Sequence, residues 1–350
     1  MQHHPITKTA NGERAASRGG VRRDAPTPPP WPSYTGVSQF VGTSQDGRVT
    51  VFVDPSLGTE ALTNAQDLVA DSDRVTAAND QIFGVNGLPV SVIVFALGGA
   101  TDGTGGADHM GCDFTTGAAI EVCASFGNPA RVSALFEAEL SECSMGANLC
   151  GVSTGEALSR LCASVVSNNA LSDFATAPTW AQDGMPDYVN QTAQTDRDTD
   201  STGCGMAFLS WLMSQGYGVN TIAPAMVALG DSGTFAQLYG NLTSDDPANA
   251  FPSFLAAVQA LPGGVTNDDP FGGSIQPAQL RHLAPWTVDL AGKIFSSILA
   301  DVAAGKTEHQ ITAGVRAVLV TSSPKAKAMR TSAAACSVTS HRLQAPRRFN

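Results

Sequence analysis

The stretch from Arg131 to Cys143 most constrains what this chain can fold into, because it places three carboxylates inside an otherwise apolar helical pattern. Apolar side chains recur there at helical spacings of three and four: Val132, Leu135, Phe136, Leu140 and Cys143. A helix advances about 100° per residue, so Ala138, Glu139 and Glu142 share roughly one third of its circumference. Carboxylates beside core residues need a metal, a shared proton or an edge that reaches water. An amphipathic helix with its polar side in solvent is the alternative.

Charge is distributed unevenly along the chain. The net charge is −11, yet residues 31–262 carry 24 acidic and only five basic side chains, whereas both ends are basic. Phosphate contacts need Lys and Arg, so we expect no nucleic-acid partner. The longest apolar run, residues 88–97, is too short to cross a bilayer, so we expect no membrane span. The oligomeric state stays open.

Six of the seven cysteines lie between Cys112 and Cys204. An even, crowded set of this kind predicts disulfides and an oxidising compartment, and therefore a secreted, periplasmic or extracellular protein. The pairing is left open. The first residues of the chain show no apolar signal-peptide core, so the source of the export signal is not visible.

Composition and periodicity divide the chain into four parts. Residues 1–47 are polar and rich in proline, which predicts a disordered lead-in. Residues 48–264 are expected to form the folded domain, and residues 265–321 a helical extension. A basic, disordered tail is expected over 322–350.

The first half of the domain has the pattern of strands around one long helix, expected over 60–83. Strands are predicted at 48–54, 89–97, 107–114 and 118–124. The second is apolar on both faces and should be central, and the third, which carries His109, should lie at an edge. The Gly-rich stretch 98–106 fits neither nucleotide-loop spacing, so we expect a flexible loop there.

The second half is mostly helical, with helices expected over 154–163, 203–215, 222–229, 234–242 and 254–261. Asp183 and Asp187 lie four residues apart and would share a helix face, although Pro186 is compatible only with a first turn or a kink. The alternating carboxylates of residues 196–200 resemble a calcium loop but lack its glycine and its closing Glu. We expect them to cap the next helix.

This order of elements resembles the catalytic domain of zincin metallopeptidases, specifically the gluzincin branch that includes thermolysin, over about residues 48–262. In that family an HExxH helix supplies two His ligands and a Glu general base, and a later helix supplies a Glu ligand. Here residues 138–142, Ala-Glu-Leu-Ser-Glu, stand where HExxH would stand. Residues 136–143, Phe-Glu-Ala-Glu-Leu-Ser-Glu-Cys, are also similar to a run in uncharacterised bacterial proteins.

The segment 180–188 is similar to the gluzincin pattern Trp-x-x-Glu-Gly-x-x-Asp-Tyr. The resemblance implies a metal ligand at Asp183 and, at Asp187, a carboxylate that steadies the first ligand position. It also implies an α+β, zincin-like fold, in which a small mixed or antiparallel sheet packs on the active-site helix and a mostly helical half follows.

The departures from the family pattern leave three hypotheses for function. The first is a pseudoenzyme that binds a peptide or protein by strand addition, with no catalysis and no required metal. The second is an active metal-dependent peptidase, with Glu139 as general base, Glu142 and Asp183 as oxygen ligands, and His109 as a nitrogen ligand or oxyanion donor. The resemblance implies zinc, whereas an oxygen-rich site suits manganese or calcium. The third is a hydrolase with paired carboxylates, as in glycosidases, formed by Glu139 with Glu142 or Asp183.

Overall fold

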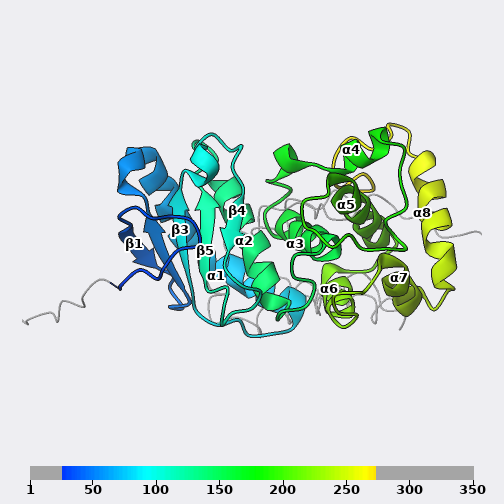
Figure 1. The fold of residues 1–350 in the computed structure, drawn as a ribbon, viewed down its shortest axis with the longest axis horizontal. Coiled ribbons are helices and arrows are strands. Elements are labelled where there is room, and N and C mark those ends of the chain that lie inside the picture. The colour runs from blue at the N-terminus through cyan, green and yellow to red at the C-terminus, as the bar shows by residue number, and fades with distance from the viewer. Residues whose placement is uncertain (1–25, 273–350) are drawn as a thin grey trace, which may run out of the picture.

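The computed structural model describes residues 26–272 and shows a mixed α+β fold (Figure 1). A five-stranded sheet lies on one side, and most of the helices gather on the other. The expected α+β class is confirmed. The predicted helical extension past residue 272, the predicted tail and residues 1–25 lie outside the described residues. In the described part of the chain, no helix is both long enough and apolar enough for a membrane span.

The sheet has the strand order β1-β2-β3-β5-β4. Its strands are β1 Gln39–Thr43, β2 Val49–Val53, β3 Val90–Phe95, β4 Ala107–His109 and β5 Ala119–Cys123. The three inner strands are parallel, and β1 and β4 pair antiparallel at the two edges. The central position of β3 and the edge position of β4 agree with the sequence prediction. β4 ends at His109 instead of reaching residue 114, because Asp113 accepts the backbone N–H groups of Thr115 and Thr116 and forms a turn.

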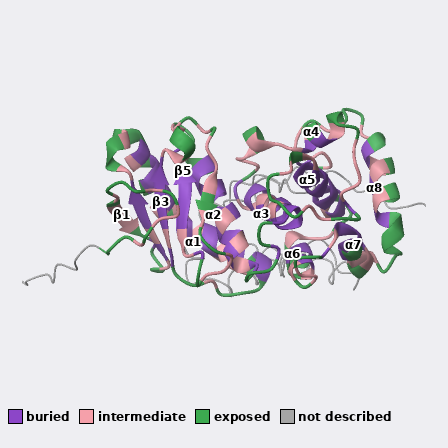
Figure 2. Ribbon diagram, in the orientation of Figure 1, coloured by how far each residue is buried: buried purple, intermediate pink, exposed green. Residues whose placement is uncertain are grey.

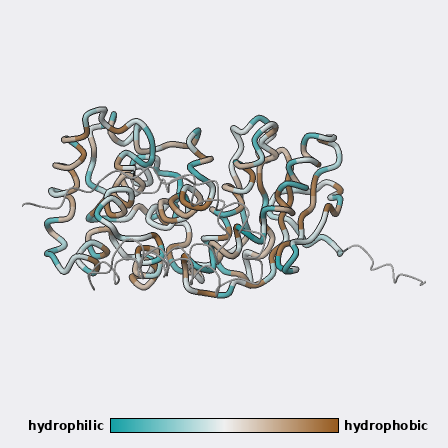
Figure 3. Tube along the Cα trace, turned by 180° about the vertical axis from the view of Figure 1, so that it is seen from behind, coloured by the Kyte–Doolittle hydropathy of each residue, from teal (hydrophilic) through white to brown (hydrophobic). Residues whose placement is uncertain are grey.

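Successive side chains along each strand point to opposite faces of the sheet, and both faces are packed. The inner face, with Val51, Val92 and Val122, packs against two long helices. Figure 2 shows β3 and β5 in the purple of buried residues, and Figure 3, seen from behind, shows hydrophobic stretches in the half of the molecule that holds the sheet. The outer face carries Phe52, Ile93 and Phe95.

Residues 31–40 cover that outer face, which corrects the expectation of a disordered lead-in from residue 26 onward. The ring of Trp31 lies 5.5 Å from that of Phe52, edge to face. The backbone N–H groups of Ser33 and Tyr34 donate to the buried carboxylate of Glu121 at 2.9 and 2.6 Å. Aromatic burial and these hydrogen bonds order a segment whose Pro-rich composition predicts disorder.

The α-helices are α1 Gly58–Phe83, α2 Pro129–Ser144, α3 Ser153–Val166, α4 Ala177–Gln182, α5 Thr199–Ser214, α6 Val219–Val227, α7 Phe235–Thr243 and α8 Ala250–Gln259. Short 3₁₀ turns occupy Pro55–Leu57, Leu97–Gly99, Ser172–Phe174 and Pro247–Asn249. α2 packs against α1, α3, β4 and β5, so it joins the sheet to the helical half. α5 forms the centre of the helical half and is buried almost throughout.

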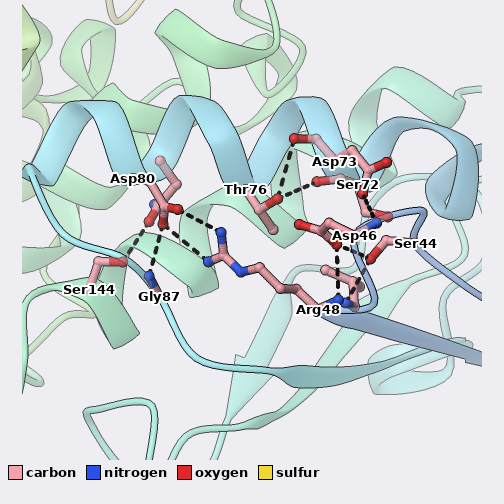
Figure 4. A network of polar contacts seen from close by, with 11 residues as sticks. Ser44, Asp46, Arg48, Ser72, Asp73, Thr76, Asp80, Gly87 and Ser144 are labelled. Carbon is pink, nitrogen blue, oxygen red and sulfur yellow. Dashed lines mark hydrogen bonds and ion pairs between the residues drawn. The ribbon is translucent and has the colours of Figure 1, made fainter.

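Arg48, the residue before β2, joins α1 to the sheet (Figure 4). Its guanidinium donates to the two carboxylate oxygens of Asp80 at 2.6 and 3.1 Å. Asp80 also accepts the N–H of Gly87, in the loop before β3. The start of β2, the end of α1 and the entry to β3 are therefore tied together at one point.

Local signals explain where α2 and α5 begin. The side chain of Asn128 accepts the N–H of Arg131, and Pro129 occupies the first turn of α2. Asp198 accepts the N–H groups of Asp200 and Ser201 at the start of α5. The predicted capping role of residues 196–200 is therefore confirmed.

The cysteines form one disulfide within residues 26–272, between Cys112 and Cys150. The remaining thiols of that part of the chain are reduced and buried: Cys123, Cys143, Cys162 and Cys204. The crowding of cysteines therefore predicted a disulfide but overstated the number, because small thiols also serve as core residues. A disulfide is compatible with an extracellular location.

Candidate metal centre

The site lies where α2 passes the edge strand β4 and consists of His109, Glu139 and Glu142. His109 pairs with Ile120 of β5, so its side chain shares the inner face of the sheet with that core residue. Glu139 and Glu142 are three residues apart on α2 and share one helix face. One ligand atom from each of the three residues lies within 4.8 Å of the others. Three of the four residues proposed from sequence as base or ligand are thus brought together.

The two ring nitrogens of His109 have different surroundings. Nδ1 lies 2.9 Å from Glu139 Oε2. Nε2 is buried without a hydrogen-bond partner within residues 26–272 and lies 3.9 Å from Glu142 Oε2. When Glu139 is ionised, as a bound cation would favour, its carboxylate can only accept, so the proton lies on Nδ1 and the lone pair on Nε2. A buried polar atom without a partner is costly, and a cation between Nε2 and Glu142 would remove that cost.

The carboxylates repel one another in a poorly solvated place. Burial raises the pKa of Glu139 well above its usual range, and the charges of Glu156, Asp108 and Asp196 raise it further. Burial, followed by the charge of Glu139, raises the pKa of Glu142 to about 8. A divalent cation would favour the ionised forms of both groups and displace their protons. The group of His109, Glu139 and Glu142 could therefore hold a metal ion.

A cavity of about 600 Å³ opens beside this group. Its lining includes the carboxylates of Asp108, Glu139 and Glu156, the guanidinium of Arg160, and apolar side chains such as Leu135 and Phe174. β4 and the loop before it form one wall, with Gly106 and Ala107. The cavity is therefore bounded by a strand edge and by the face of α2 that carries the candidate ligands.

Sequence reasoning missed Glu156 of α3. This side chain lines the cavity and raises the pKa of both Glu139 and Glu142. Burial raises the pKa of Glu156 itself, and Arg160 opposes that shift from 3.3 Å away. The sequence does contain a signal for Glu156: it and Arg160, one helical turn apart, are the only charged residues in α3.

Asp183 and Asp187 lie outside the three-residue group. Asp183 is exposed at the C-cap of α4, and its carboxyl group interacts with Asp200. Asp187 accepts the N–H groups of Val189 and Asn190, so it stabilises a turn. The helix that would have brought both to one face ends at Gln182, before Pro186.

Ala138 lines the cavity, at the position where the family resemblance implies the first His ligand. Its methyl group offers no ligand atom, so the imidazole in this site comes from β4 and not from α2. Comparisons of the chain with protein-family models, with curated proteins and with solved structures found no match. The function is therefore argued from the geometry of the site itself.

Proposed function

We propose that this protein holds a divalent cation at His109, Glu139 and Glu142 and binds extended peptide segments in the adjoining cavity, as a zincin-like protein specialised for binding. The observation that carries the proposal is the buried Nε2 of His109, which has no hydrogen-bond partner in the described part of the chain and faces Glu142 while Glu139 contacts Nδ1. Metal-bound histidines commonly donate their other N–H to a carboxylate in this way.

The three side chains have separate roles in this proposal. His109 Nε2 and the Glu142 carboxylate are the ligands, and Glu139 orients the ring of His109. A mixed set of nitrogen and oxygen donors suits zinc or manganese better than calcium, which prefers oxygen alone.

The strand edge supports peptide binding by strand addition. Cys123 donates its N–H to the carbonyl of Gly106, so these two residues form a hydrogen-bonded pair of the antiparallel ladder. Such pairs alternate with non-bonded pairs, so the N–H and C=O groups of Ala107 and His109 point away from β5. Ala107 lines the cavity, and a peptide lying there could therefore pair with the free edge of β4.

Hydrolysis is the second candidate function, and the position of Glu139 favours it. Glu139 lines the cavity and has a raised pKa, which suits a group that accepts a proton during the reaction. A bound divalent cation would supply activation of water. Glu139 also contacts His109, however, and one carboxylate serves both roles poorly, so binding is the function that we favour. The paired-carboxylate glycosidase hypothesis gains little support from this cavity, because Phe174 is the one aromatic side chain among the described residues that line it.

The proposal is tested with fluorescently labelled, extended peptides from unfolded casein. We expect fluorescence anisotropy to show peptide binding that strengthens when Mn²⁺ or Zn²⁺ is added. Ala107→Pro removes the outward N–H without removing a ladder bond to β5, and should weaken binding on the order of tenfold. Ala107→Val keeps the N–H and is the matched control.

Equal binding by both Ala107 variants would contradict strand addition, and peptide binding that ignores metal would contradict the role of the cation. The same samples incubated with casein distinguish binding from hydrolysis. Metal-dependent cleavage that Glu139→Gln abolishes would establish the second candidate function in place of the first.

A further inference from the structure

The disulfide joins the two parts of the chain that supply the candidate ligands. Cys112 lies three residues after His109, in the turn that leaves β4. Cys150 lies in the loop between α2 and α3. The Cα atoms of the two cysteines are 5.7 Å apart. The disulfide therefore connects the segment that carries His109 to the loop between the two helices that carry Glu139, Glu142 and Glu156.

Among the described residues, the other contacts of this segment are non-covalent: β4 pairs with β5 and packs on α2, and Cys143 Sγ of α2 donates to the carbonyl of Gly117. β4 has three residues and pairs only with β5 at the edge of the described sheet. The turn after it is stabilised from within, through Thr116, whose hydroxyl accepts the N–H of Cys112. Its backbone hydrogen bond to the α2–α3 loop runs from Ala147 N–H to the carbonyl of Cys112, at 2.7 Å. This hydrogen bond therefore acts at the same residue as the disulfide.

From this placement we infer that the Cys112–Cys150 disulfide controls the affinity of the metal centre, so that the protein binds its cation tightly only in the oxidised state. The inference rests on the proposed function, because it concerns the same cation. Oxidation holds His109 within ligand distance of Glu142. After reduction, the pairing of β4 with β5, its packing on α2, the contact between His109 Nδ1 and Glu139 and the hydrogen bond from Ala147 remain. No covalent link then fixes the turn after β4 to the α2–α3 loop, so the distance between Nε2 and Glu142 is less restricted.

The redox step is chemically simple, and its sulfurs are accessible. Cys150 is exposed and Cys112 is half-buried. A thiolate of a dithiol reductant attacks Cys150 Sγ, the S–S bond breaks, and Cys112 leaves as a thiolate that takes up a proton. The second thiolate of the reductant then displaces Cys150, so the reductant becomes a cyclic disulfide and both cysteines become thiols. Oxidation by a disulfide acceptor reverses these steps, and metal loading would follow passage into an oxidising compartment.

The first experiment measures Mn²⁺ affinity by isothermal titration calorimetry. Mn²⁺ is the probe because thiolates bind it poorly, so new cysteine ligands do not mask the effect. The oxidised wild-type chain is compared with Cys112→Ser/Cys150→Ser, whose fold is checked by circular dichroism and by a cooperative thermal transition. We expect the dissociation constant of the double variant to be larger by a factor of about 10 to 100, the range seen when support around a ligand is lost.

The second experiment needs no variant and uses the reciprocity of linked equilibria. If oxidation strengthens Mn²⁺ binding tenfold, saturating Mn²⁺ must favour the disulfide tenfold, which corresponds to about 30 mV for a two-electron couple. The wild-type chain is equilibrated in dithiol–disulfide buffers with and without Mn²⁺. Alkylation and mass spectrometry then give the oxidised fraction of Cys112 and Cys150.

The outcomes separate the two proposals. A weaker variant together with a Mn²⁺-dependent redox equilibrium supports redox control. Equal Mn²⁺ affinities, or a redox equilibrium that Mn²⁺ does not move, overturns redox control and leaves the metal centre standing. Failure of the oxidised wild-type chain to bind Mn²⁺ or Zn²⁺ overturns the metal centre, and redox control with it.

Discussion

At the scale of single residues, the three carboxylates of α2 serve different purposes. Glu139 and Glu142 face His109, whereas Glu137 points into the core, where Asn79 donates to its Oε1 at 3.1 Å. The other oxygen of Glu137, Oε2, is buried and has no hydrogen-bond partner among the residues that the structure describes. Burial raises the pKa of Glu137 to about 8, and the hydrogen bonds from Asn79 and Ser141 only partly oppose this shift. Glu137 is therefore protonated in the folded protein at neutral pH.

This raised pKa predicts a stability that falls as the pH rises. The ordinary carboxyl pKa is 4.5 and the folded value is about 8, so between these limits the folded state binds the proton that the unfolded state has lost. The contribution of Glu137 is complete below the lower value and is lost through the upper one, with a slope of about 1.4 kcal/mol per pH unit between them. Glu137→Gln should remove this slope. Urea unfolding at several pH values measures it, and Glu60→Gln, at an exposed site, is the control. Parallel curves for wild type and Glu137→Gln would refute the buried proton.

The sequence predicted part of the site and missed the rest for a physical reason. Helical periodicity places Glu139 and Glu142 on one face, and alternation places His109 on an edge strand, so these residues were identified. Tertiary packing decides which later segment of the chain lies next to Glu139, Glu142 and His109, and local sequence patterns do not show it. Asp183 and Asp187 satisfy local turns instead, and Glu156 belongs to a short helix whose position no local pattern specifies.

At the scale of secondary-structure elements, the helical half depends on close approach to α5. A Cβ at Gly205 would lie 2.7 Å from the Cβ of Ala157 in α3 and 2.8 Å from the ring of Phe235 in α7. Both neighbours are buried. Gly205 therefore sets the spacing of three helices, although glycine inside a helix is intrinsically unfavourable.

Gly205→Ala should consequently destabilise the protein, despite the better helix propensity of alanine. Overpacking a filled core typically costs about 1 to 3 kcal/mol, which exceeds the propensity gain of about 1 kcal/mol. Ser214→Ala, at the exposed end of the same helix, is the control and should change the free energy of unfolding by less than about 0.5 kcal/mol. A stabilised Gly205→Ala variant would show that α3 and α7 do not pack as described.

Elements were easier to predict than sites. Periodicity identified α1, α2, α5 and the three parallel strands because each buries a regular face. β1 was missed, since Gln39–Thr43 is short, contains Gly42 and follows a Pro-rich stretch. A tight turn through Asp46 and Gly47 connects β1 to β2. Pairing with β2 orders β1 as a strand.

At the scale of the whole molecule, the segments at the two ends of the described chain pack on different halves: the first on the sheet and the last on the helices. Residues 31–40 cover the outer face of the sheet. Near the other end, Asp268 accepts the N–H groups of Thr176 and Ala177 at the start of α4, and Phe271 packs on the helical core. The domain thus extends past residue 264, where the sequence pattern predicted its end.

Removing the N-terminal segment should therefore destabilise the sheet. Deletion of residues 1–38 would expose Phe52 and Phe95 and would leave Glu121 without the donors Ser33 and Tyr34. We expect a loss of about 3 kcal/mol or more, because a buried carboxylate loses its hydrogen bonds together with apolar burial. Deletion of residues 1–25 keeps every one of these contacts and is the control. Thermal unfolding that is equal for the two truncations would show that the segment does not stabilise the sheet.

The most direct test of the central claim is a calorimetric titration of Mn²⁺ and Zn²⁺ into the oxidised protein and three variants. We predict one cation per chain, an affinity at least about tenfold weaker in His109→Gln and Glu142→Gln, and an unchanged affinity in Asp183→Asn. An affinity that depends on Asp183 and not on Glu142, or no binding of either cation, would contradict a metal centre formed by β4 and α2.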